Sequence, residues 1–113
     1  MKNNSGVKVV YQILSFLIPF AVYLATLAPT VTFIDSGELA TVAAKLGVAH
    51  PTGYPLFTVL GNLFTKIPVG DEVYRLNFMC AVISSAALFM FFNLLVFILK
   101  YQKFPDEPVS DVY

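Results

Sequence analysis

Residues 78–99, FMCAVISSAALFMFFNLLVFIL, decide the fold of this chain. None of these 22 residues carries a charge, and Arg75 and Lys100 stand on either side of the stretch. At about 1.5 Å per residue, a helix of this length crosses the roughly 30 Å apolar core of a bilayer. We therefore predict a transmembrane helix over residues 78–99.

The composition of the whole chain agrees with a membrane protein. Hydrophobic residues make up 58% of the 113 residues and charged residues only 12%, against about 25% charged residues in typical soluble domains. The mean hydropathy is +0.75. A soluble core of this size does not hide so much apolar surface, so we expect lipid to cover part of it. The net charge is zero and no basic cluster exists, which argues against a nucleic-acid partner.

A second apolar stretch, residues 9–28, also suits a transmembrane helix. Its basic start and its small residues near the end are typical of a signal peptide as well. However, the stretch is long for the apolar part of a signal peptide. Pro29 also directly follows Ala28, which would end a possible cleavage site over residues 25–28. We therefore predict a retained span over residues 9–28, which Pro19 kinks and Pro29 ends.

Two spans place both ends of the chain on the same side of the membrane. Lysines are denser in the short tails, residues 1–8 and 100–113, than in the loop, residues 29–77. Because basic residues favour the cytoplasmic side, we predict cytoplasmic tails and an extracytoplasmic loop. The sequence predicts an all-α protein of the cell (inner) membrane.

Within the loop, the apolar periodicity predicts two short amphipathic helices, near residues 36–46 and 55–67. Asp35 is placed to cap the first, with Glu38 reaching back as in a capping box. Gly47 is a natural stop for the first helix, and Pro55 suits the first turn of the second. Helices of this kind lie in the membrane interface or pack on other helices.

Asp35 and Glu38 are also the first candidates for chemistry. They lie just beyond the first span, and charged groups at a membrane boundary are costly to desolvate. Charged groups at such a place usually serve the structure or the chemistry of a site. The alternative is that Asp35 and Glu38 serve only as a helix cap.

Four spaced motifs stand out in the sequence: YLATLAPTV at 23–31, DSGEL at 35–39, LGVAHPTGYPLF at 46–57 and YRLN at 74–77. Together they resemble the N-terminal region of a family of multi-spanning membrane proteins. The family occurs in bacteria and animals and is related to protein O-mannosyltransferases, within the C-type glycosyltransferase superfamily. Two positions depart from the family pattern, which often has Pro at Thr52 and Phe at Leu39.

The resemblance implies a polyprenyl-phosphate sugar as donor and an essential acid near the start of the first external loop. The matching acid is Asp35, as base or acceptor-orienting carboxylate, with Glu38 as its supporting partner. We further expect Arg75 to contact the phosphate, and His50 and Tyr54 to shape the sugar or acceptor pocket. The partners implied are membrane lipid, a protein or glycan acceptor, and further transmembrane helices. Since two spans do not enclose a donor and an acceptor, we expect the isolated chain to be inactive.

Other interpretations stay open at this point. Asp35, Glu38 and His50 together offer the ligand types of a divalent metal, although the sequence has no tight ligand spacing. His50 precedes a proline and suits a simple turn, and Arg75 suits an interfacial side chain. The whole chain could be an inert two-span hairpin that assembles with other membrane chains, or a fragment of a transporter.

Overall fold

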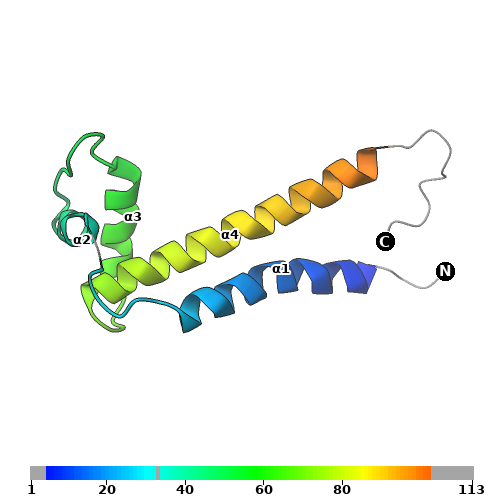
Figure 1. Cartoon of the computed structure of the whole chain (residues 1–113), viewed down its shortest axis with the longest axis horizontal. Coiled ribbons are helices and arrows are strands. Elements are labelled where there is room, and N and C mark those ends of the chain that lie inside the picture. Colours follow the sequence, from blue (N-terminus) through cyan, green and yellow to red (C-terminus); the bar gives the residue numbers. More distant parts are fainter. Residues whose placement is uncertain (1–4, 33, 103–113) are drawn as a thin grey trace. The chain divides into compact units, whose positions relative to one another are not determined.

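The computed structural model describes residues 5–32 and 34–102, which hold four α-helices and no strand. The helices are α1 (Ser5–Ala25), α2 (Ser36–Lys45), α3 (Pro55–Thr65) and α4 (Glu72–Tyr101) (Figure 1). The predicted all-α class, with two long apolar helices and two short helices between them, is confirmed. Parts of the two predicted tails, residues 1–4 and 103–113, lie outside the described residues.

The contacts divide the chain into two units, which we describe separately. The long-helix unit holds residues up to Val22 and from Ile83 onward, and therefore most of α1 and the later part of α4. The loop unit is Tyr23–Val82 and contains α2, α3 and the start of α4.

The long helices α1 and α4 are both long and apolar enough to cross a membrane. Within α1 no described residue is buried by protein, and in the later part of α4 Met90 is 70% exposed. Such apolar exposure suits a helix that contacts lipid or further protein.

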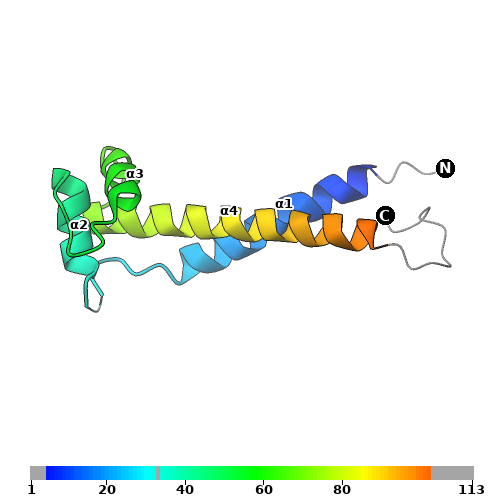
Figure 2. The same ribbon diagram turned by 90° about the horizontal axis from the view of Figure 1, so that it is seen from above.

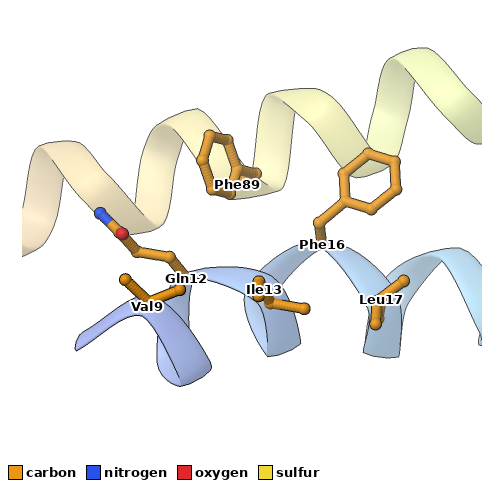
Figure 3. Close-up of a pocket in the computed structure, with 6 residues that line it drawn as sticks. All are labelled: Val9, Gln12, Ile13, Phe16, Leu17 and Phe89. Carbon is orange, nitrogen blue, oxygen red and sulfur yellow. The ribbon is translucent and has the colours of Figure 1, made fainter. Parts of the chain in front are cut away.

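Two polar side chains pair within the long-helix unit. Gln12 Nε2 donates a hydrogen bond of 2.7 Å to Asn93 Oδ1, and Asn93 Nδ2 donates one to the Phe89 carbonyl. Interhelical hydrogen bonds of this kind hold apolar helices together in a membrane. Beside the pair lies an apolar hollow of about 410 Å³, toward which Phe16 and Phe89 project (Figure 3).

In the loop unit, α2 and α3 pack on each other beside the start of α4 (Figures 1 and 2). The two short helices approach closely because α3 has Gly61 where it meets Ala43 of α2 and Leu76 of α4. The core consists of small and medium apolar side chains. Its buried members are Ala40, Ala43, Leu76 and Met79, and partly buried Phe57, Leu60, Phe64 and Val73 pack against them.

Three polar side chains tie the elements of the loop unit together. Asn62 on α3 donates to the carbonyls of Ala43 and Ala44, the last turn of α2. Asn77 on α4 donates a 2.8 Å bond to the carbonyl of Ala28. The Arg75 guanidinium binds carbonyls at the end of α3 and in the α3–α4 connection. The last turn of a helix leaves carbonyls without partners within the helix. The bonds to Ala43, Ala44 and Thr65 satisfy such carbonyls at the ends of α2 and α3.

The helix ends differ in part from expectation. Asp71 caps α4, with its Oδ1 accepting from the Tyr74 N–H at 2.7 Å. Asp35 occupies the N-cap position of α2 but makes no capping bond with its side chain, so the predicted capping box is wrong. At the other end of α2 the left-handed residue is Leu46, at φ 52°, rather than Gly47. Gly47 instead donates its N–H to the Val42 carbonyl, which ends the helix.

Candidate active site

The start of α2 places two carboxylates on the surface of the loop unit. Asp35 is the residue before the helix, Glu38 lies in its first turn, and both are exposed. The partial positive charge of a helix N-terminus favours carboxylates at these positions. The helix start therefore holds two negative charges without needing Asp35 as a hydrogen-bonding cap.

The segment after α2 returns the chain to these carboxylates. It turns at Leu46, and a 2.7 Å bond from the Gly53 N–H to the His50 carbonyl closes a second turn. Gly53 and Tyr54 both have positive φ, at 81° and 46°, before α3 begins. Positive φ is accessible to glycine at little cost, so Gly53 permits the sharp turn between His50 and the start of α3.

Glu38 binds His50 twice. The backbone N–H of His50 donates a 2.9 Å hydrogen bond to Glu38 Oε1, and His50 Nδ1 lies 3.1 Å from Oε2. The Glu38 side chain is 44% exposed and the His50 side chain is 37% exposed. This two-point contact spans twelve residues of sequence and closes the loop between α2 and α3.

The contact with His50 also changes the acidity of Glu38. Its pKa is lowered from the ordinary glutamate value, first because the His50 backbone N–H donates to the carboxylate and next because the His50 ring does. Hydrogen bonds to the charged form favour that form. Glu38 is therefore held as a carboxylate, an acceptor of hydrogen bonds and not a donor.

Asp35 joins this pair. Asp35, Glu38 and His50 each offer a ligand-type atom, and these three atoms lie within 4.8 Å of one another. Two carboxylate oxygens and an imidazole nitrogen are donors that divalent transition metals and Zn²⁺ accept. The donor set therefore fits a divalent ion chemically, while Glu38 and His50 already bond to each other.

Tyr54 closes one side of the cluster. It precedes α3, and its ring lies edge-on to the His50 ring with the centroids 5.4 Å apart. Aromatic pairs favour this edge-to-face arrangement. Asp35, Glu38, His50 and Tyr54, four of the five predicted site residues, therefore gather at one place.

Arg75, the fifth predicted residue, is engaged elsewhere in the loop unit. Its Nε donates to the Val69 carbonyl at 3.0 Å and its Nη2 to the Gly70 carbonyl at 2.9 Å, and Nη1 donates to the Thr65 carbonyl. These bonds use three of the five N–H groups of a guanidinium. Arg75 thus fixes the α3–α4 connection, and within the described part of the loop unit its guanidinium bonds to these carbonyls and not to Asp35 or Glu38.

The comparisons with known proteins agree with the resemblance. Residues 35–111 match the family described as the protein O-mannosyl-transferase TMEM260 N-terminal domain, which is more than half of the chain. The chain belongs to this family. The match to the TMEM260 N-terminal domain begins at Asp35, the first residue of the cluster.

Two curated relatives are named protein O-mannosyl-transferases. The chain is 47% identical over 73 residues to TMEM260 of Mus musculus, covering 64% of this chain and 10% of that protein. It is 37% identical over 90 residues to tmem260 of Dictyostelium discoideum, covering 76% of this chain and 11% of that protein. The chain thus spans about a tenth of the length of each relative. No solved structure matches it.

Proposed function

We propose that this chain is the N-terminal module of a membrane glycosyltransferase that moves a mannose-like sugar from a polyprenyl-phosphate donor to a hydroxyl of a protein or glycan. One observation carries the proposal: Asp35, Glu38, His50 and Tyr54 gather on the surface of the loop unit in a chain of the TMEM260 N-terminal domain family. The names of the relatives support the sugar and the protein acceptor.

In the proposed reaction the oxygen of the acceptor hydroxyl attacks the anomeric carbon of the sugar. The bond from that carbon to the phosphate oxygen breaks, and its electron pair leaves with the lipid phosphate. The hydroxyl proton passes to a base, and Asp35 is the base or the carboxylate that orients the hydroxyl. The exposed position of Asp35 supports this role, because both substrates must reach it.

Arg75 is the proposed contact for the donor phosphate. A guanidinium is always charged and suits phosphate oxygens, and two of its five N–H groups are not used by the three carbonyl bonds. Beside it lies an apolar hollow of about 190 Å³ lined by Phe64, Ile67, Val69, Tyr74 and Phe78. The apolar hollow suits the hydrocarbon chain of a polyprenyl phosphate, and the Arg75 guanidinium beside it suits the phosphate group.

The proposed location is the cell (inner) membrane, with the loop unit outside the cytoplasm. The two long apolar helices support a membrane protein. A lipid-linked donor requires the reacting groups to lie at the membrane surface, which is where two spans would place the loop between them. Further transmembrane helices, in the same protein or in partner chains, complete the enclosure of the substrates.

The test of the function is Asp35→Asn, with Asp71→Asn as the matched control. Both aspartates precede a helix of the loop unit, but Asp71 caps α4, and asparagine is an equally good cap. Membranes from cells that express the variant protein from its native gene are given radiolabelled polyprenyl-phosphate mannose and an acceptor peptide. We expect Asp35→Asn to reduce transfer by about a hundredfold or more, the scale of general base catalysis, and Asp71→Asn to keep it.

The same assay decides between the enzyme and an inert structural hairpin. If membranes with the unchanged protein transfer no sugar above those lacking it, the glycosyltransferase proposal is wrong and the chain serves as an assembly subunit. If Asp35→Asn transfers sugar as fast as the Asp71→Asn control, Asp35 has no role in the reaction.

A divalent metal held by the cluster is a secondary proposal, which rests on the donor types of Asp35, Glu38 and His50. Chelation with EDTA, followed by addition of Mn²⁺ or Mg²⁺, tests it in the same assay. Loss of transfer that the added ion restores would support a metal. Unchanged transfer after chelation would exclude one.

A further inference from the structure

The imidazole of His50 bonds to Glu38 through Nδ1, and its other ring nitrogen, Nε2, lies on the far side of the ring. Nδ1 lies 3.1 Å from Glu38 Oε2, and the backbone N–H of His50 donates a hydrogen bond to Glu38 Oε1. The ring is held from a second side by the edge-on ring of Tyr54. His50 therefore has few ways to rotate, and its Nε2 has a defined position.

The identity of the partner determines which nitrogen carries the hydrogen. An ionised carboxylate only accepts hydrogen bonds, so the ring nitrogen that bonds to it must be the donor. A neutral imidazole carries one N–H and one lone pair. With the hydrogen on Nδ1, the lone pair is on Nε2, which makes Nε2 an acceptor.

Resting on the function proposed above, we infer that Glu38 is a positioning residue that fixes His50 in its Nδ1–H form, so that His50 Nε2 and the Asp35 carboxylate together accept a substrate hydroxyl. Asp35 belongs to the same cluster, in which one ligand-type atom of Asp35, of Glu38 and of His50 lie within 4.8 Å of one another. A hydroxyl that is to be oriented and activated can be held by two acceptors of one cluster. Glu38 then acts through His50 and does not itself touch the substrate.

The hydrogen position can be measured directly because the chain contains one histidine. We would label the 113-residue chain with ¹⁵N-histidine, place it in detergent micelles above neutral pH, and read the two ring nitrogen shifts. We expect the Nδ1–H form in the unchanged chain. Glu38→Ala should restore the Nε2–H form that free histidine favours, and Glu72→Ala, in the first turn of α4, should change nothing.

Two substitutions of His50 separate the role of Nε2 from that of Nδ1. The amide of asparagine takes the place of Nδ1–H and can still donate to Glu38, but it leaves nothing at Nε2. The longer glutamine carries its amide to the Nε2 position, where its oxygen can accept. In the mannosyl-transfer assay on native-gene membranes we expect His50→Asn to lose about tenfold in kcat/KM, the equivalent of one hydrogen bond. His50→Gln should retain more activity than His50→Asn.

The opposite order would overturn the inference, because a histidine that only ties the loop to α2 is better replaced by asparagine. A Nε2–H form in the unchanged chain, or no change with Glu38→Ala, would overturn it as well. Failure of the proposed function looks different: the unchanged protein then transfers no sugar, while the ring shifts still report whether Glu38 sets the form of His50.

Discussion

Glu38 illustrates how one side chain can determine the geometry of a whole loop. Its two oxygens are both bound by His50, one through the backbone and one through the ring. The backbone bond positions the chain and the ring bond orients the imidazole. Because one carboxylate does both, a change at Glu38 affects the path of the loop and the side chain of His50 together.

The lowered pKa of Glu38 makes this link sensitive to acid. A group whose pKa is lower in the folded protein stabilises the fold above its ordinary pKa, and this contribution disappears as the pH falls through the folded value. We expect Glu38→Gln to destabilise the chain most near neutral pH and progressively less from about pH 5 downward, since the carboxylate is then protonated first in the unfolded state and, at lower pH, in the folded state as well. Thermal unfolding of both chains in micelles across this range measures the difference. A difference that grew on acidification would show that the carboxylate is not what stabilises the link.

At the level of single residues, the sequence located the candidate side chains but did not predict their partners. Asp35 and Glu38 stand out because they are charged residues next to an apolar span. Their spacing suggested a capping box, which is a local interaction. The actual partner of Glu38 is twelve residues away, and it depends on the turns at Leu46 and Gly53, which spacing within one helix does not reveal.

Among the elements, the crossing of α2 and α3 has the least room to change. A Cβ added at Gly61 would lie 2.8 Å from both Ala43 Cβ and Leu76 Cδ2. The leucine methyl can rotate away, but the alanine Cβ is attached directly to the backbone of α2. A larger residue at Gly61 must therefore separate the two helices.

Gly61→Ala should therefore destabilise the loop unit. Overpacking costs about 1–3 kcal/mol, and the better helix propensity of alanine returns about 1 kcal/mol, so we expect a net loss of up to about 2 kcal/mol. Gly37→Ala in α2 is the matched control, since its new Cβ meets only Val31 Cγ1 at an ordinary 3.6 Å. Amide hydrogen exchange in α2 and α3 measures both. If Gly61→Ala proved as stable as Gly37→Ala, the close approach of α2 and α3 at Gly61 would be contradicted.

The elements themselves were the most predictable part of the fold. An uncharged run of apolar residues gives a long helix, and apolar residues at helical spacing give the short ones, because both signals are local. The contacts that hold the loop unit together are not local. Asn62 binds the end of α2 and Asn77 binds Ala28, and nothing in the surrounding sequence distinguishes these asparagines from exposed ones.

At the scale of the whole molecule, the proposed function depends on which side of the membrane the cluster faces. If α1 and α4 both cross the membrane, everything between them lies on one side and the outer ends of both helices lie on the other. The relatives are about ten times longer than the matched segment, so in the proposed enzyme much additional protein would surround the substrates. The side of the membrane on which the loop lies can nevertheless be measured with this chain alone.

Cysteine labelling tests this topology. Cys80 is the one cysteine of the chain, so its replacement by serine gives a background without thiols. Val48→Cys places a thiol in the loop at an 87% exposed position, and Tyr101→Cys places one at the end of α4, where the residue is 69% exposed. We expect a membrane-impermeant maleimide to label Val48→Cys in intact cells and Tyr101→Cys only after permeabilisation, since a spanning α4 separates the two. Labelling of both thiols in intact cells would mean that α4 does not span. The reverse order would put Asp35 in the cytoplasm and require a donor presented on that side.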